Sequence, residues 1–344
     1  MPVSRRKFAL IGAGVFGEMH AKTYHAHPGV ELTAICDISA ERARGMAAKY
    51  GAGRACTDWR EIATDPGIDA VSVVTPDFAH TEIAVGLAQA GKHLLVEKPL
   101  AMTVEDCEGI IRAAKESGVK LMVDFHNRWN PAFAEAHQQI RSDELGAPRF
   151  VYLRASDTTF VPLTMLPWAA KSSSLWFLGS HAIDLACWLL GEWPRRVYGV
   201  APRGVLRERG VDVPDFYQSV LEFPSGAVAS IENSWLLPPS FPTIFDLKCE
   251  VIGAKGAIHI DISSARTLQI VGEKGLRYGD VIAAPVVHGE PKGFLIESIR
   301  HFADCVLEDK EPLVSGEDGL EVTRTACGIE LSVQTGEPVL LERA

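Results

Sequence analysis

Three glycines near the start of the chain have the spacing of a phosphate-binding turn. Gly12, Gly14 and Gly17 form the pattern G-x-G-x-x-G between a short apolar run and a helical stretch. In such a turn the first glycine permits the tight bend, the second lets the backbone approach a pyrophosphate, and the third lets the helix pack closely. Because the helix N-terminus also offers free N–H groups, this arrangement predicts a dinucleotide-binding site.

Asp37 bears on which dinucleotide is bound. It follows Gly17 by twenty residues, at the end of a second apolar run. A carboxylate there accepts hydrogen bonds from the adenosine ribose and repels a 2′-phosphate, although it could instead simply cap a helix. Arg42 and Arg44 lie further along and could reach a phosphate, but no arginine directly follows Asp37. The sequence therefore favours NAD over NADP.

Lys98 is the first candidate for the chemistry itself. It lies in the triplet Glu97-Lys98-Pro99 after one apolar run, and Thr75-Pro76, with His80 four residues later, follows another. Ligands of doubly wound sheets bind outside the carboxyl ends of the strands, where these residues are expected. A lysine there could stabilise negative charge on a reacting oxygen. The alternative is an ordinary solvated loop lysine.

His181 is the second candidate. It lies three residues before Asp184, so the two side chains share one face of a helix and the carboxylate could orient the imidazole. The ordinary pKa of histidine is close to physiological pH, which suits a general base. The alternative is a structural histidine at the start of a helix.

The pattern of elements predicts an α/β protein. Five apolar runs, at residues 7–11, 32–36, 70–74, 93–96 and 120–123, alternate with helices, which indicates a parallel Rossmann sheet covered on both faces. Ser39 and Thr103 are expected N-caps, and Asp58 with Glu61 has the spacing of a capping box. Pro131 is an expected first helical residue. Beyond it, hairpin spacing predicts a largely antiparallel open sheet with strands at 149–156, 216–223, 227–234, 245–252 and 257–260. Helices are expected near 178–190, 292–308 and 316–335. The expected domains are residues 1–124, which bind NAD, and 125–344, which bind substrate and associate with other subunits.

Composition narrows the partners. A net charge of −10 without a basic block argues against nucleic acid. The seven cysteines form no C-x-x-C pair, so no metal site and no disulfide framework are expected. Residues 4–8 resemble a twin-arginine export signal, but cleavage beyond them would destroy the glycine turn. No segment is apolar enough to span a membrane, and a cytoplasmic protein is expected.

Together these motifs resemble the glucose-fructose oxidoreductase/inositol dehydrogenase (Gfo/Idh/MocA) family. The resemblance covers nearly the whole chain and includes the closing segments 302–304, 312–314 and 316–319. It implies hydride transfer between NAD(P) and a hydroxyl carbon of a sugar, sugar derivative or cyclitol, with Lys98 and His181 as the catalytic pair. The expected cofactor-binding residues are Gly12, Gly14, Val15, Phe16, Gly17, Asp37, Ile38, Thr75, Pro76, His80, Glu97 and Lys98.

One position departs from that family. Phe177 stands where the family usually has an aspartate, four residues before the histidine, and residues 171–173 replace a glycine-rich stretch. The departure implies either a divergent substrate, with a carboxylate supplied by Asp184 or Asp157, or a non-catalytic NAD-binding sensor. The expected substrate-binding residues are Asp184, Phe177, Trp176, Lys171, Asp157 and His126. Phe177 and Trp176 could instead fill the core, the usual fate of aromatic residues. A homodimer or homotetramer formed through the C-terminal sheet is also expected.

Overall fold

The computed structural model describes residues 5–263, 267–272 and 275–342, and internal contacts divide the chain into two units. The first unit comprises Met1–Asn130 together with Ile282–Leu320. The second comprises Pro131–Val281 and Glu321–Ala344. The predicted division after residue 124 therefore did not anticipate that a late segment of the chain packs with the N-terminal part.

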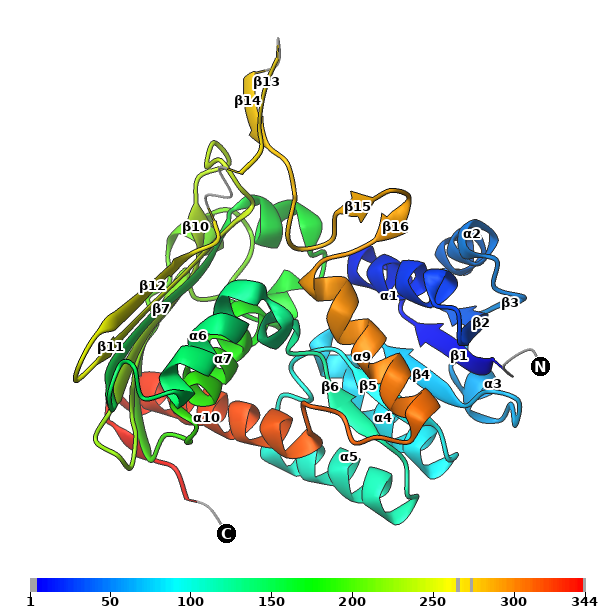
Figure 1. Cartoon of the computed structure of the whole chain (residues 1–344), viewed down its shortest axis with the longest axis horizontal. Coiled ribbons are helices and arrows are strands. Elements are labelled where there is room, and N and C mark those ends of the chain that lie inside the picture. The colour runs from blue at the N-terminus through cyan, green and yellow to red at the C-terminus, as the bar shows by residue number, and fades with distance from the viewer. Residues whose placement is uncertain (1–4, 264–266, 273–274, 343–344) are drawn as a thin grey trace. The chain divides into compact units, whose positions relative to one another are not determined.

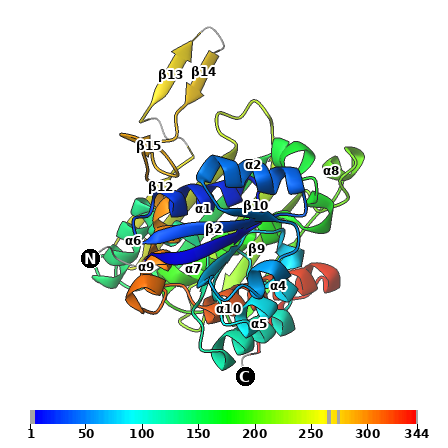
Figure 2. The same ribbon diagram turned by 90° about the vertical axis from the view of Figure 1, so that its right-hand side faces the viewer.

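The first unit contains a parallel sheet of the predicted Rossmann type, with strand order β3-β2-β1-β4-β5-β6 (Figures 1 and 2). Its strands are β1 (Arg6–Ile11), β2 (Val30–Cys36), β3 (Arg54–Cys56), β4 (Ala70–Val73), β5 (His93–Val96) and β6 (Leu121–Val123). The order steps outward from β1 in both directions, so the carboxyl ends of β1, β2, β4 and β5 meet at one edge. Five of these strands were predicted, and the short β3 was not.

The helices of this sheet begin largely where local chemistry predicts. They are α1 (Val15–Ala26), α2 (Ala40–Tyr50), α3 (Arg60–Ala63), η1 (Asp77–Ala79), α4 (His80–Gln89), α5 (Val104–Glu116) and η2 (His126–Trp129). The hydroxyls of Ser39 and Thr103 accept backbone N–H groups three residues on, as expected of N-caps. The predicted capping box of Asp58 and Glu61 is wrong. The Asp58 carboxylate accepts the backbone N–H of Arg60 instead of that of Glu61, and α3 starts at Arg60.

Helix α9 (Phe294–Glu308) explains why the late segment belongs to the first unit. It contacts α1, and the ring of Phe302 lies 6.0 Å from that of Phe8 on β1, with both side chains fully buried (Figure 1). An amphipathic helix that buries its apolar stripe against this sheet stabilises the N-terminal unit rather than the domain that precedes it in sequence.

The second unit contains a mostly antiparallel sheet, as predicted, and its strand order is β12-β11-β7-β10-β9-β8-β17. Among these described strands, only β7 and β10 pair in parallel. The strands are β7 (Pro148–Thr158), β8 (Arg196–Val200), β9 (Phe216–Glu222), β10 (Val228–Leu237), β11 (Phe245–Gly253), β12 (Ala257–Asp261) and β17 (Val339–Leu340). Sequence patterns missed β8 and β17. Helix α7 (Ser180–Leu190) packs against β7 and β10, and α6 (Pro131–Arg141) packs on α7 (Figure 1).

The remaining elements are short except for the last of them, a helix of 20 residues. They are η3 (Val161–Met165), η4 (Ala169–Lys171), η5 (Leu175–Gly179), α8 (Val205–Glu208), β13 (Gln269–Gly272), β14 (Gly275–Tyr278), β15 (Val286–Val287), β16 (Glu290–Pro291) and α10 (Gly316–Thr335). Among the residues described, no helix is both long and apolar enough to cross a bilayer. All seven cysteines, which fall within the described ranges, are free thiols.

Candidate active site

The glycine turn between β1 and α1 fits a bound pyrophosphate. A Cβ atom at Gly12, whose φ is +106°, would lie 2.2 Å from the carbonyl oxygen of Val74, and one at Gly17 would lie 1.9 Å from that of Gly12. A Cβ at Gly14 would meet no described atom within 4 Å. The protein's own packing therefore requires two of the glycines, while the third faces open space that a ligand can use.

Asp37 lies at the end of β2 beside this turn. Its Oδ2 accepts the backbone N–H of Ala13 at 2.8 Å, and its Oδ1 accepts the N–H of Ser39 at 2.8 Å. The Arg42 guanidinium also donates to Oδ1, at 2.7 Å from Nη2. The carboxylate thus links the turn to α2, and the arginine considered as a phosphate ligand is paired with it. Ile38, the next residue along the chain after Asp37, is 91% exposed.

His80 ties two strand-end loops together. Its Nδ1 lies 2.8 Å from the carbonyl oxygen of Pro99, and its Nε2 lies 2.9 Å from that of Thr75. The side chain is fully buried. Because both ring nitrogens face backbone carbonyls, the geometry favours a positioning role for His80 over direct cofactor contact.

Glu97 and Lys98 follow β5 and are both buried, at 6% and 7% exposure. The peptide bond between Lys98 and Pro99 is cis. Burial raises the pKa of Glu97, but a hydrogen bond with His20 and the charges of His20 and Lys98 outweigh it, and the pKa falls well below its usual range. Glu97 is therefore an anion next to the candidate catalytic lysine.

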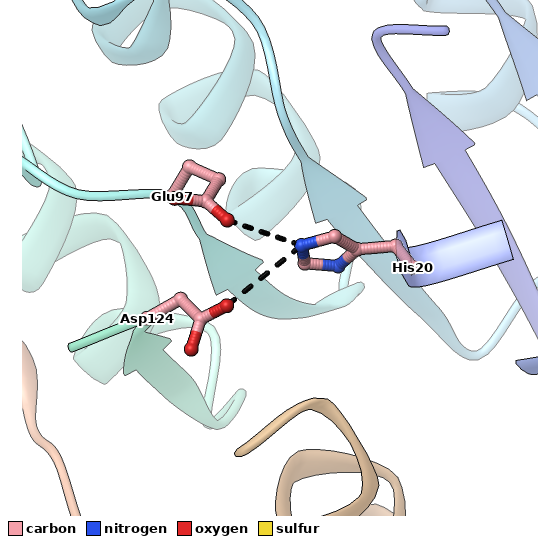
Figure 3. Close-up of side chains that lie close together, drawn as sticks. All are labelled: His20, Glu97 and Asp124. Atoms are coloured by element: carbon pink, nitrogen blue, oxygen red, sulfur yellow. Dashed lines mark hydrogen bonds and ion pairs between the residues drawn. The ribbon is translucent and has the colours of Figure 1, made fainter. Parts of the chain in front are cut away.

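The same region contains two residues that sequence reasoning missed, His20 on α1 and Asp124 after β6 (Figure 3). Nε2 of His20 lies 3.2 Å from Oε1 of Glu97 and 3.8 Å from Oδ2 of Asp124. Two signals could have found them. His20 follows Gly17 by three residues on the same helix, and Asp124 directly follows a strand, as Asp37 and Glu97 do.

His126, a predicted substrate-binding residue, belongs to the first unit. Burial, with a further contribution from the positive charge of Lys98, lowers its pKa to about 4. Its ring lies 5.7 Å from that of Phe294 on α9. At neutral pH it is therefore an uncharged imidazole, suited to hydrogen bonding rather than to carrying charge.

The remaining predicted substrate residues belong to the second unit. His181 and Asp184 both lie on α7 and are buried, and Asp157 is buried near the end of β7. The helix is seated closely on the sheet here, because a Cβ at Gly179 would lie 2.8 Å from Oδ1 of Asn233. Lys171 is exposed on η4.

Two adjacent aromatic residues on η5 have different surroundings. Phe177 is half-buried, and its ring centroid lies 6.2 Å from both Trp168 and Trp235. Trp176 is 3% exposed and its indole N–H donates to Oε1 of Glu330 at 2.9 Å. The structure thus places Trp176 in the core and leaves Phe177 the better candidate for a ligand contact.

Comparisons with known proteins agree with this organisation. Residues 6–125 match a family model described as "Oxidoreductase family, NAD-binding Rossmann fold", and residues 133–259 match the "GFO/IDH/MocA C-terminal domain". The scyllo-inositol 2-dehydrogenase (NAD(+)) of Bacillus subtilis is 31% identical over 97% of this chain and 96% of its own. A levoglucosan dehydrogenase of Pseudarthrobacter phenanthrenivorans is 33% identical over 65% of this chain and 66% of its own.

Solved structures show the same fold. A probable dehydrogenase from Thermotoga maritima has a TM-score of 0.81 at 26% identity, with 97% of this chain and 98% of that chain covered. GenD2 from gentamicin A biosynthesis, solved in complex with NAD, has a TM-score of 0.85 at 25% identity, with 100% and 98% covered.

Proposed function

This chain belongs to the GFO/IDH/MocA family of oxidoreductases, and from this we propose that it oxidises a hydroxyl carbon of a sugar, sugar derivative or cyclitol with NAD. The observation that carries the proposal is the glycine turn with Asp37 at the end of β2, where Gly14, unlike Gly12 and Gly17, faces open space. Lys98, buried at the end of β5, supplies an ammonium group that can stabilise negative charge on the reacting oxygen.

When bound over residues 12–17, NAD supplies the hydride acceptor. Lys98 donates a hydrogen bond to the reacting substrate oxygen and stabilises the negative charge that develops there. His181 takes the hydroxyl proton, with Asp184 one helical turn away to orient its ring. The two roles could be exchanged, because both side chains can donate to and accept from an oxygen in the appropriate protonation state.

The substrate pocket should be less polar than one with an aspartate at position 177. The Phe177 ring packs near two tryptophans, and a substrate hydroxyl buried against it without a partner is penalised by about 1–3 kcal/mol. A deoxy or anhydro sugar suits such an edge, and the similar levoglucosan dehydrogenase is named for an anhydro sugar. The exposed Lys171 supports a second candidate class, the acidic sugars.

Turnover decides between an enzyme and a non-catalytic sensor, the alternative that Phe177 favours. The experiment measures NAD reduction with inositols, sugars, sugar acids and anhydro sugars, together with NAD binding by calorimetry. Reduction with any of these substrates supports the proposal. Tight NAD binding without turnover on the whole panel contradicts it and favours the sensor.

We further propose that the protein is a cytoplasmic homodimer or homotetramer without nucleic-acid or membrane partners. The free cysteines suit a reducing compartment. The sheet face opposite α7 carries exposed apolar side chains on adjacent strands, and Tyr198 pairs with Val220 there. Light scattering of the wild type and of Val220→Lys tests the association, and a monomeric wild type contradicts it.

A further inference from the structure

A buried group of ionisable side chains in the first unit includes Glu97, the residue that directly precedes Lys98. His20 comes from α1, Glu97 from the end of β5 and Asp124 from the end of β6, and Figure 3 shows the imidazole facing both carboxyl groups. Their exposed fractions are 1%, 6% and 2%. Burying two carboxyl groups together is costly unless hydrogen bonds and opposite charge compensate, so the arrangement calls for a specific reason.

The hydrogen bonds of the group fix Glu97 in place. His20 spans between β4 and β5, with Nδ1 3.0 Å from the Ser72 hydroxyl and Nε2 3.2 Å from Oε1 of Glu97. The other carboxylate oxygen, Oε2, accepts the backbone N–H of Lys98 at 3.3 Å. Glu97 therefore holds the backbone of the residue whose side chain is the proposed catalytic group.

The polar groups that face this cluster come from every element packed around it in the first unit. Tyr24 on α1 bonds the Ser72 hydroxyl at 2.6 Å, and Ser298 on α9 bonds Asp124. His126 after β6 and the Lys98 ammonium both interact electrostatically with Glu97. Besides His20, the Glu97 carboxylate therefore interacts with the Lys98 ammonium.

The two carboxyl groups differ in protonation. Burial and the negative charge of Glu97 raise the pKa of Asp124 well above its usual range. The pKa of Glu97 is lowered, because the hydrogen bond with His20 and the charges of His20 and Lys98 outweigh burial. At neutral pH the cluster therefore carries its negative charge on Glu97 and a proton on Asp124.

We propose that His20, Glu97 and Asp124 are positioning residues that keep a single negative charge beside Lys98, so that the lysine stays a charged hydrogen-bond donor to the substrate. This inference rests on the proposed function. His20 selects Glu97 as the ionised carboxyl by donating to it. Asp124 stays neutral and fills the remaining space without adding a second charge.

The pH dependence of kcat tests this division of roles. Loss of the Glu97 charge in Glu97→Gln removes stabilisation of the Lys98 ammonium, so the alkaline limb of the profile should move toward acid by about one unit or more. Asp124→Asn replaces a group that is already neutral and should leave that limb in place. Asp124→Asn should also retain the KM for NAD within about twofold, because Asp124 is not proposed to touch the cofactor.

Glu18→Gln is the matched control. Glu18 lies two residues before His20 on α1 and is paired instead with Lys49 and Tyr50, so the variant removes the same charge outside the cluster. Its profile should match that of the wild type. Equal shifts in Glu97→Gln and Asp124→Asn, or no shift in Glu97→Gln, would overturn the proposal.

An infrared measurement tests the proton without any turnover. The apo wild type at neutral pH should show a carboxylic-acid C=O band that is absent from Asp124→Asn and retained in Glu18→Gln. Absence of that band from the wild type, or stoichiometric bound metal on elemental analysis, overturns the proposal, since histidine and carboxylates can also ligate zinc. Should Glu97→Gln fail to fold, these spectra still decide. A wild type with the band but no turnover refutes the proposed function and leaves the protonation pattern standing.

Discussion

Two alanine substitutions in the glycine turn should have opposite consequences for stability and for NAD binding. Gly14 has φ −88°, and an added Cβ meets no described atom within 4 Å. Gly14→Ala should therefore fold normally, while its methyl group occupies the space proposed for the pyrophosphate. At Gly17 the added Cβ would lie 1.9 Å from the Gly12 carbonyl oxygen, so the backbone must move.

The magnitudes follow from those distances. For Gly14→Ala we expect the Kd for NAD to rise at least tenfold, which corresponds to about 1.4 kcal/mol. For Gly17→Ala we expect a loss of stability of about 3 kcal/mol, the upper range for overpacking. At about 2–4 °C per kcal/mol for a domain of this size, its Tm should fall by roughly 6–12 °C.

Calorimetry with NAD and thermal unfolding of the apo protein measure both effects. Gly45→Ala is the control, since Gly45 is an exposed position within α2 where an added methyl group would have no described atom within 4 Å. It should gain about 0.5–1 kcal/mol in stability and bind NAD normally. If Gly14→Ala binds NAD as tightly as the wild type, the pyrophosphate does not lie over this turn. If Gly14→Ala instead loses as much stability as Gly17→Ala, a methyl group at position 14 does not fit without strain and the inference of open space there is refuted.

Three further substitutions test the site. Lys98→Met should lower kcat by about two orders of magnitude or more, as steady-state kinetics would show; unaltered turnover would remove Lys98 from the mechanism. Phe177→Asp should favour fully hydroxylated inositols over anhydro or deoxy sugars by roughly tenfold or more in relative kcat/KM. If the wild type turns over nothing while Phe177→Asp acts on inositol, the wild-type protein is the sensor. His126 has a folded-state pKa of about 4 against an ordinary value of 6.5, so the unfolded state binds more protons between these values and stability falls as pH drops from 6.5 to 4. At about 1.4 kcal/mol per pKa unit this loss approaches roughly 3 kcal/mol, and denaturant titrations should show that His126→Gln is spared it; an equal acid sensitivity of the two proteins would contradict the burial of a neutral imidazole.

Features set by neighbouring residues were predicted well from the sequence. Ser39 and Thr103 cap their helices because the capping bond spans three residues and depends little on the rest of the fold. The glycine turn is local at Gly17, which faces the Gly12 carbonyl, whereas Gly12 faces the carbonyl of the distant Val74. By contrast, β3 has three residues and was missed, because so short a run has no detectable alternation. It becomes a strand only through its pairing with β2.

Features that depend on distant segments could not be read from spacing. Helix α9 was predicted as a helix, but its amphipathic pattern does not state which sheet it covers, and Phe302 meets Phe8 from almost three hundred residues away. The same holds for the buried cluster. His20 and Asp124 each carry a local signal, the spacing from Gly17 and the strand end, but neither signal shows that the two residues meet until the sheet brings α1, β5 and β6 together.

The two aromatic residues of η5 show where sequence reasoning reaches its limit within a single turn. Trp176 and Phe177 were considered together, as either substrate contacts or core. Adjacent residues on a helix point in different directions, and here Trp176 donates to Glu330 while Phe177 packs near Trp168 and Trp235. Because η5 is a π-helical turn, its side chains do not follow the 3.6-residue period on which face assignments rest. π-Helical turns occur frequently at functional sites. This irregular turn ends two residues before His181 and five before Asp184, so the departure from regular helix coincides with the position where the substrate contact is proposed.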